Sequence, residues 1–161
     1  MNKIRIGFGF DVHRLVEGRA FWLGGLKLEH DKGSLGHSDG DVLIHAICDA
    51  LLGAANARDI GFHFPNTSDA YKNIDSKVLL SDVAAIIRKE GYEIGNIDAT
   101  VCLENPKINP HVGEMQRVLS DCLRIPPGDI SIKATTNEGL GYVGSETGVN
   151  AYAVALISRT N

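Results

Sequence analysis

Three side chains in the first third of the chain have the types and spacing of a metal site. Asp11 and His13 lie two residues apart in a segment whose pattern predicts a β-strand. Because alternate residues of a strand face the same side, this carboxylate and this imidazole converge on one point. His45 lies among apolar residues of a predicted helix and is the candidate third ligand. Two histidines, one carboxylate and an open fourth position are typical of a catalytic zinc ion.

The surroundings of these three residues leave two interpretations open. Asp49 follows His45 by one helical turn, so it is placed to accept a hydrogen bond from the outer ring nitrogen and to orient the ring as a second-shell residue. Alternatively, His13 and His45 are separate histidines that form ordinary hydrogen bonds and hold no metal.

A second polar cluster, His37-Ser38-Asp39-Gly40-Asp41, precedes the same predicted helix. Hydroxyl, carboxylate and backbone N–H groups meet there, and the positive end of the helix dipole favours a bound anion. The simpler interpretation is a helix cap, because Ser38 and Asp41 have the spacing of a capping box. Capping leaves His37 and Asp39 without a role, so both interpretations stand.

A third cluster, Lys133-Ala134-Thr135-Thr136-Asn137-Glu138, follows a predicted short strand. Threonine hydroxyls can bind phosphate oxygens, and Glu138 can hold a hard cation such as Mg²⁺ beside them. A plain polar loop is the alternative interpretation.

Two glycine motifs need a different explanation. The segment from Gly139 to Gly144 has the G-x-G-x-x-G pattern, but a strand follows it and too few residues remain for a βαβ unit. A dinucleotide site is therefore excluded. Gly7 and Gly9 lie inside a predicted strand, where they indicate that another backbone approaches closely.

Hydrophobic periodicity predicts the elements that position these clusters. Strands are expected over residues 4–13, 96–103, 130–134 and 148–159, with a hairpin over 21–29. Helices are expected over 41–57, from 75 or 76 to 90, and from 110 to just before 126. Turns and polar loops fill 30–36, 58–74 and 135–147. We therefore expect a single domain over residues 1–161 with an α/β fold. Within this class, the expected architecture is an α+β two-layer sandwich with a mixed four-stranded sheet, helices packed on one face of the sheet, and a small hairpin.

Composition excludes several classes of protein. With 16 Lys and Arg against 20 Asp and Glu, the 161-residue chain has a net charge of −4, which argues against a nucleic-acid partner. Its apolar stretches are far shorter than the roughly 20 residues that span a bilayer. The first strand begins at Ile4, which leaves no room for a signal peptide. Cys48, Cys102 and Cys122 are widely spaced within apolar runs, so we expect buried free thiols in a reducing compartment.

The motifs, taken in order, are more specific than any one alone. They are Gly7-Phe-Gly9-Phe-Asp11-Val-His13, His37-Ser-Asp-Gly-Asp41-Val, Asp49-Ala-Leu-Leu-Gly-Ala-Ala55, Asp59-Ile-Gly61 with Phe64-Pro65, and Lys133-Ala-Thr-Thr136. This set resembles the 2-C-methyl-D-erythritol 2,4-cyclodiphosphate synthase family of non-mevalonate isoprenoid biosynthesis, and the resemblance runs from about residue 4 to residue 158.

The resemblance implies a cyclising lyase that releases CMP from 4-diphosphocytidyl-2-C-methyl-D-erythritol 2-phosphate. It also implies a homotrimer with active sites between subunits, one zinc ion per subunit, and a second divalent ion, Mg²⁺ or Mn²⁺, that binds with substrate. A cytoplasmic bacterial enzyme is expected, with a mature plastid enzyme as the alternative.

Individual residues take their expected roles from the same resemblance. Asp11, His13 and His45 match the zinc ligands, and Glu138 matches the ligand of the second ion. The methylerythritol phosphate end is expected to contact His37, Ser38 and Asp59, and Gly61 is a further expected substrate-binding residue. The cytidine diphosphate pocket, supplied by the neighbouring subunit, is expected to contain Pro106, Lys107, Asn109, Ala134, Thr135 and Thr136. Thr136, His37 and Glu138 are the expected catalytic residues, with Thr136 polarising the β-phosphate.

The chain departs from the family pattern at three places. Asn66 stands where an aspartate is common, in a loop that covers the substrate. Ser145 stands where an arginine is common near the trimer axis, so an isoprenoid diphosphate site on that axis is in doubt. Tyr142 replaces a usual phenylalanine.

The implied chemistry fits the residue types. The reaction brings two phosphates together, and two unit charges about 4 Å apart repel by about 1 kcal/mol in water and more at lower dielectric. Cations offset that repulsion, and the attacking phosphate is already ionised, so neither a general base nor a nucleophilic side chain is needed. Two other classes remain: a zinc hydrolase or phosphodiesterase in which water attacks, and a non-catalytic trimer that binds an isoprenoid diphosphate.

Overall fold

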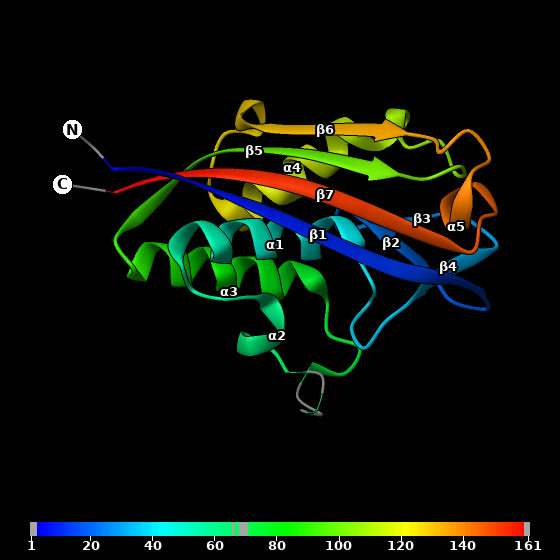
Figure 1. Ribbon diagram of the computed structural model, residues 1–161, viewed down its shortest axis with the longest axis horizontal. Coiled ribbons are helices and arrows are strands. Elements are labelled where there is room, and N and C mark those ends of the chain that lie inside the picture. Colours follow the sequence, from blue (N-terminus) through cyan, green and yellow to red (C-terminus); the bar gives the residue numbers. More distant parts are fainter. Residues whose placement is uncertain (1–2, 66, 68–70, 160–161) are drawn as a thin grey trace.

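A computed structural model describes residues 3–65, 67 and 71–159, and these residues form two layers (Figure 1). One layer is a β-sheet and the other is formed by the long helices. The strands are β1 (Ile4–Glu17), β2 (Phe21–Leu23), β3 (Leu26–Leu28), β4 (Lys32–Leu35), β5 (Tyr92–Cys102), β6 (Ile130–Thr135) and β7 (Gly148–Arg159). The α-helices are α1 (Val42–Ala55), α2 (Ile60–His63), α3 (Ser76–Lys89), α4 (Val112–Leu123) and α5 (Gly141–Gly144), with 3-10 helices η2 (Asn109–His111) and η3 (Pro127–Asp129).

The main sheet has five strands in the order β4-β1-β7-β5-β6, so the predicted four-stranded sheet is wrong by one strand. The additional strand, β4, lies in the segment 30–36 that was predicted as a turn. It forms because β1 continues four residues beyond His13, and this extension pairs antiparallel with Lys32–Leu35. The sheet is mixed, as predicted: β5 and β6 are parallel and the other pairs are antiparallel. The predicted hairpin is confirmed as the separate β2-β3 pair.

All three predicted long helices are confirmed, and two predicted loops contain short helices. Helix α2 lies within residues 58–74, where the Asp59 carboxylate caps it by accepting a hydrogen bond from the Phe62 N–H at 2.9 Å. Helix α5 lies within residues 135–147. A helix of four residues shows too little periodicity to be recognised from sequence.

Helix α1 packs directly on β1 because two glycines remove the side chains between them. A Cβ at Gly7 would lie 1.8 Å from the Ala50 carbonyl oxygen, and one at Gly9 would lie 1.9 Å from that of Ala46. The predicted close backbone approach is therefore confirmed. Its consequence is that the first turn of α1, which carries His45, lies against the part of β1 that follows Gly9.

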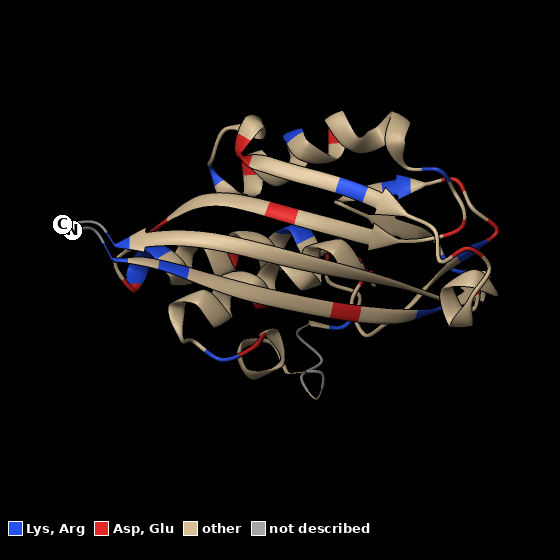
Figure 2. Ribbon diagram, turned by 45° about the horizontal axis from the view of Figure 1, so that its top comes forward, with Lys and Arg blue, Asp and Glu red and all other residues tan. Residues whose placement is uncertain are grey.

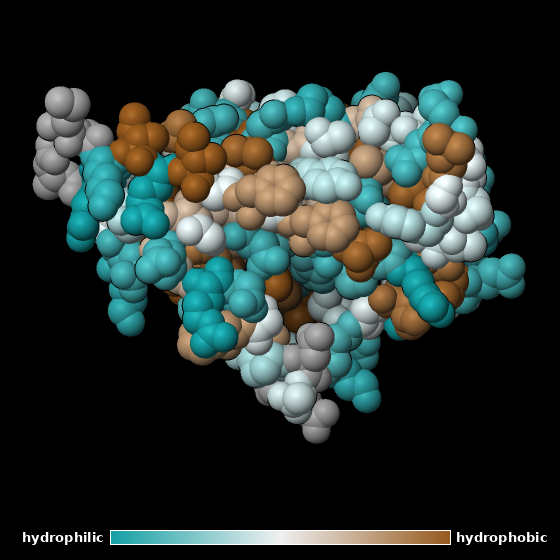
Figure 3. Space-filling model, viewed as in Figure 1, coloured by the Kyte–Doolittle hydropathy of each residue, from teal (hydrophilic) through white to brown (hydrophobic). Residues whose placement is uncertain are grey.

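The face of the sheet away from the helices carries exposed apolar side chains. Alternate residues of β1 point outward, and Ile6 and Phe8 are 68% and 64% exposed. Tyr152 and Val154 of β7 continue this surface, and the Tyr152 ring lies near the rings of Phe8 and Phe10. Figure 3 shows the resulting apolar band, and in Figure 2 most of β1 and β7 is free of charged residues.

All three cysteines are free thiols, with Cys48 and Cys102 buried and Cys122 half-buried. In the part of the chain that the structure describes, no helix has the length and apolar character needed to cross a bilayer.

Candidate active site and metal centre

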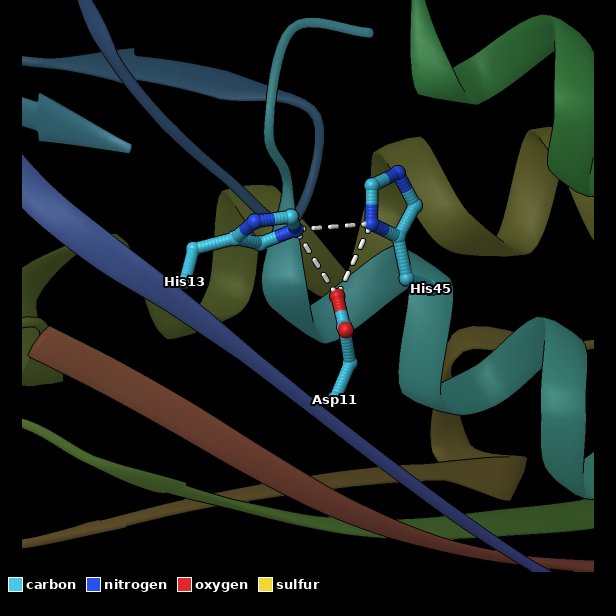
Figure 4. A group of neighbouring side chains, drawn as sticks. All are labelled: Asp11, His13 and His45. Atoms are coloured by element: carbon cyan, nitrogen blue, oxygen red, sulfur yellow. Dashed lines mark hydrogen bonds and ion pairs between the residues drawn. The ribbon is translucent and has the colours of Figure 1, made fainter. Parts of the chain in front are cut away.

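Asp11, His13 and His45 converge in the structure as predicted (Figure 4). Asp11 Oδ2 lies 2.9 Å from His13 Nε2 and 2.9 Å from His45 Nδ1. The two ring nitrogens lie 3.1 Å apart. Strand β1 supplies the aspartate and the first histidine from one face, and α1 supplies the second histidine from its first turn. These three donors suit a divalent cation such as zinc.

The outer nitrogen of each imidazole has a partner, which leaves the inner nitrogen to face the centre. His13 Nδ1 lies 3.1 Å from the carbonyl oxygen of Leu35 on β4. Because a carbonyl only accepts, His13 donates from Nδ1 and its Nε2 keeps a lone pair. His45 Nε2 lies 3.1 Å from Ser38 Oγ and 3.0 Å from Ser76 Oγ. Such outer contacts are what a metal-binding histidine requires.

The three groups also shift one another's acidity. Burial alone would raise the pKa of the Asp11 carboxyl. In the metal-free protein, a proton on the ring nitrogen of His13 or His45 that faces Asp11 is donated to this carboxylate in a hydrogen bond, and these hydrogen bonds outweigh burial and lower the pKa from 3.8 to about 2. Burial alone would lower the pKa of His13, but the hydrogen bond and charge of Asp11 raise it above 6.5. Asp11 is therefore ionised at neutral pH and available as an anionic ligand.

A cavity of about 160 Å³ opens beside this centre. Its polar wall holds the three converging residues together with His37, Ser38 and Asp49, and its apolar wall includes Phe64 and Tyr71. Gly61 of α2 also lines it, while the exposed Asp59 lies one residue before α2 and caps that helix. His37, Ser38 and Gly61 thus line the cavity beside the centre, and their contacts with substrate stay predictions.

Two predictions about the surroundings of His45 are corrected. Asp49 does not receive the outer N–H of His45: its Oδ1 accepts from the Ile60 N–H at 2.8 Å, and the serine hydroxyls take the place beside the ring. Ser38 and Asp41 do not form a capping box either. Asp41 caps α1 by itself, and its buried carboxylate also accepts from the N–H groups of the β2-β3 turn.

A second cavity, of about 200 Å³, lies where β5 and β6 end. It is lined by the six residues predicted for the cytidine diphosphate pocket and by Leu103 and Ile108; the six are Pro106, Lys107, Asn109, Ala134, Thr135 and Thr136. Nucleotide binding by these residues stays a prediction. Beside it, Thr136 donates a 2.6 Å hydrogen bond to Glu138, whose side chain is exposed. The two cavities share no lining residue within one chain.

Several residues that shape these sites were not recognised from the sequence. Ser76 starts α3 and resembles an ordinary cap residue, and Asp39 belongs to the predicted polar cluster but its contact with Ser76 was not predicted. Glu104 accepts from the Asn137 N–H at 2.8 Å and so holds the turn that carries Glu138. Their partners are far away in the sequence, so no local pattern marks them.

Two of the three departures from the family pattern are visible in the structure. The Tyr142 hydroxyl accepts a 2.6 Å hydrogen bond from the Asn150 side-chain amide, a contact that phenylalanine cannot make. Ser145 Oγ lies 3.0 Å from Thr147 Oγ1 in the turn before β7 and supplies no positive charge there. Asn66 lies outside the described residues.

Comparison with known proteins adds independent findings. Residues 4–158 match the YgbB family. The chain is 67% identical over 157 residues to the 2-C-methyl-D-erythritol 2,4-cyclodiphosphate synthase of Cytophaga hutchinsonii, covering 98% of this chain and 99% of that protein. It is 63% identical to the synthase of the same name from Bacteroides fragilis, with the same coverage.

Solved structures agree in fold. The IspF of Plasmodium falciparum in complex with CDP has a TM-score of 0.86 at 35% identity, covering 100% of this chain and 99% of that chain. The bifunctional IspDF of Campylobacter jejuni has a TM-score of 0.96 at 36% identity. The match covers 100% of this chain and 44% of that bifunctional protein.

Proposed function

The chain belongs to the YgbB family, and from this premise we propose that it is a cyclising phosphorus–oxygen lyase. Its substrate is 4-diphosphocytidyl-2-C-methyl-D-erythritol 2-phosphate, and its products are 2-C-methyl-D-erythritol 2,4-cyclodiphosphate and CMP. The observation that carries this proposal is the convergence of Asp11, His13 and His45 at the wall of a small cavity.

The reaction requires one new bond and one broken bond. An oxygen of the 2-phosphate bonds to the β-phosphorus of the same molecule. The bond from that phosphorus to the oxygen of the CMP group breaks, and the electron pair leaves with CMP. No water is consumed, and the attacking oxygen is already anionic. The protein therefore has to fold the substrate into its ring-closing pose and to offset the repulsion between its phosphates.

The residues of the first cavity suit the methylerythritol phosphate end. Asp11, His13 and His45 would hold a zinc or similar divalent ion, which when bound supplies positive charge to phosphate oxygens. His37 and Ser38 offer polar contacts beside it. Phe64 and Tyr71 give the cavity an apolar wall that fits the carbon skeleton and excludes water.

The residues of the second cavity suit the cytidine diphosphate end. Lys107 offers an exposed cation. The Thr136 hydroxyl, which donates to Glu138 in this structure, can turn to donate to a β-phosphate oxygen when Glu138 holds a cation instead. Glu138, beside Thr136, would hold a second ion, Mg²⁺ or Mn²⁺. The CDP named in the Plasmodium falciparum complex is a ligand of this chemical class.

A product assay tests the lyase against the metal-dependent phosphodiesterase that the same ligand set would suit. We expect ³¹P NMR to show the cyclic diphosphate and CMP in equal amounts, with no ¹⁸O taken up from labelled water. A linear phosphate product carrying ¹⁸O would contradict the proposal and identify a hydrolase.

The active enzyme is proposed to be a homotrimer with each site between neighbouring subunits. Two features support this assembly: the two half-sites are separate within one chain, and the apolar band on β1 and β7 needs a cover. We expect light scattering to give about three times the 17.3 kDa subunit mass. Phe8→Glu should dissociate the trimer, whereas Val78→Glu, at an equally apolar exposed position on α3, should not.

Mixing two inactive variants tests the shared site directly. His45→Ala removes the metal half, and Thr136→Ala weakens the nucleotide half. Random trimers of the two should regain up to about one quarter of wild-type turnover, because each site draws its halves from different subunits. Mixed trimers with no regained turnover would show that each site lies within one subunit.

The setting of the reaction follows from the same premise. We propose that it takes place in a bacterial cytoplasm, since the relatives compared above include bacterial synthases.

A further inference from the structure

Asp39 accepts three hydrogen bonds, and two of them come from Ser76, which contacts the outer side of the metal centre. Its Oδ1 accepts from the Ser76 hydroxyl at 2.5 Å and from the Asp41 N–H at 3.1 Å. Its Oδ2 accepts from the Ser76 N–H at 2.9 Å. Ser76 is fully buried at the start of α3, and its hydroxyl oxygen lies 3.0 Å from His45 Nε2. Asp39, Ser76 and His45 therefore form one chain of contacts that ends at a predicted metal ligand.

The chemistry of these groups fixes the direction of that chain. An ionised carboxylate only accepts hydrogen bonds, so the single hydroxyl hydrogen of Ser76 is committed to Asp39. The hydroxyl oxygen can then meet His45 only as an acceptor. The ring must donate from Nε2, and its other nitrogen, Nδ1, is left with a lone pair.

We propose that Asp39 is a positioning residue which, through the Ser76 hydroxyl, keeps the proton of His45 on Nε2 and aims Nδ1 at the metal. This inference rests on the metal centre of the proposed function and adds residues that the predicted ligand set does not contain. Ser38 assists, because its oxygen also lies within reach of Nε2 at 3.1 Å.

The alternative proton position shows why such a device is useful. Asp11 Oδ2 lies 2.9 Å from His45 Nδ1, and its carboxylate favours a proton on that nitrogen. A ring protonated on Nδ1 points an N–H at the place where the ion binds and cannot be a ligand. The Asp39–Ser76 contacts on the opposite side of the ring favour the metal-competent form.

Zinc affinity tests this inference, measured by competition with a chromophoric chelator at constant pH. Ser76→Ala and Asp39→Asn should each weaken zinc binding by about ten- to a hundredfold, the range typical of lost outer contacts to a metal-binding histidine. Because Asp39 acts through Ser76, the double variant should lose no more than the larger single loss. Ser76→Thr keeps the hydroxyl and should retain most of the affinity.

A matched control separates positioning from a general loosening of α3. Asp75 caps α3 one residue earlier, accepting from the Lys77 N–H at 2.9 Å. Asp75→Ala removes this cap, so it should disturb the start of the helix and leave zinc affinity unchanged. In addition, NMR of the zinc-loaded protein should show a slowly exchanging His45 Nε2–H in the wild type and in Asp75→Ala, and faster exchange in Ser76→Ala.

The outcomes distinguish this inference from the proposed function. If wild-type protein binds zinc and forms the cyclic product while both variants keep wild-type affinity, the positioning role is overturned and the function stands. Equal weakening by Asp75→Ala would also overturn it, since a loosened helix would then explain the loss. If the wild type binds no zinc, the metal centre and this inference fail together.

Discussion

The two cavities of this chain are built in opposite ways. In the first, the polar groups around the centre are held by partners from elsewhere in the fold: β4 holds His13, and the start of α3 holds His45. The ligand side chains are between 12% and 25% exposed. In the second, Lys107, Ala134 and Thr135 are exposed, and the Lys107 ammonium group donates to the nearby Glu104 carbonyl oxygen. The first half is complete in one chain, and the second is an open surface.

This difference indicates a division of labour. Binding a small cation requires donors fixed to within a fraction of an ångström, which buried hydrogen bonds provide. A nucleotide is larger and needs walls on several sides, which an exposed loop and strand end do not provide alone. A second copy of the chain is the natural source of the missing walls in the proposed trimer.

The largest expected effect comes from removing a metal ligand from the first cavity. His45→Ala should abolish zinc binding and reduce turnover by about a thousandfold or more, because charge stabilisation at the reacting phosphates is lost. The fold should survive, since the ring is not part of the hydrophobic core. Zinc content and CMP release measure both effects, and His111→Ala on η2 is the control. Normal turnover in His45→Ala would remove the metal centre from the mechanism.

The open half should respond separately to loss of Glu138. Glu138→Gln keeps the side-chain shape but removes the charge, so the Mg²⁺ or Mn²⁺ concentration for half-maximal turnover should rise by about ten- to a hundredfold. Zinc content should stay at the wild-type level, because Glu138 does not line the first cavity. An unaltered response to Mg²⁺ and Mn²⁺ would defeat the role given to Glu138.

Loss of Lys107 sharpens the comparison further. Lys107→Ala removes an exposed cation from the second cavity, so KM for the cytidine substrate should rise by about tenfold. Zinc affinity should not change. Lys89→Ala, at the end of α3, removes an exposed charge away from both cavities and should leave KM unaltered. A fall in zinc affinity in Lys107→Ala would show that the two halves are not independent.

The sequence predicts some residues of the two cavities better than others. Asp11 and His13 were predictable because strand alternation places them on one face, and His45 because it interrupts an apolar helix. The family resemblance assigned Lys107 and Thr136 to one pocket, and both line the second cavity. These signals are local or shared across the family.

What the sequence did not predict depends on contacts between distant segments. Strand β4 exists because β1 runs longer than its apolar pattern, and Ser76 faces His45 only because α3 lies beside α1. Asp49 has the right helical spacing for the role that Ser76 fills, but its carboxylate turns toward Ile60 instead. Spacing within one helix cannot show which neighbouring element supplies the nearer partner.

The final contrast concerns the stability of the protein stripped of metal rather than its turnover, and it compares a carboxylate from each region. Asp11, in the first cavity, has its pKa lowered to about 2, so it stabilises the fold above roughly pH 4 and loses this effect as the pH falls. His13 has a raised pKa, so its contribution is present below roughly pH 6.5 and is lost as the pH rises through the raised value. Asp98 pairs with Lys133 beside the second cavity and also has a lowered pKa, but both side chains are about half exposed.

We therefore expect Asp11→Asn to lower the free energy of unfolding by up to about 2 kcal/mol between roughly pH 4 and pH 6.5, with a smaller loss on either side. Asp98→Asn should change it little at any pH, because water screens an exposed pair. Denaturant unfolding in EDTA across this pH range measures both variants. Equal losses in the two would mean that the first cavity is no more preorganised than the surface beside the second. That result would contradict the contrast between a first cavity with fixed polar groups and a second cavity that is an open surface.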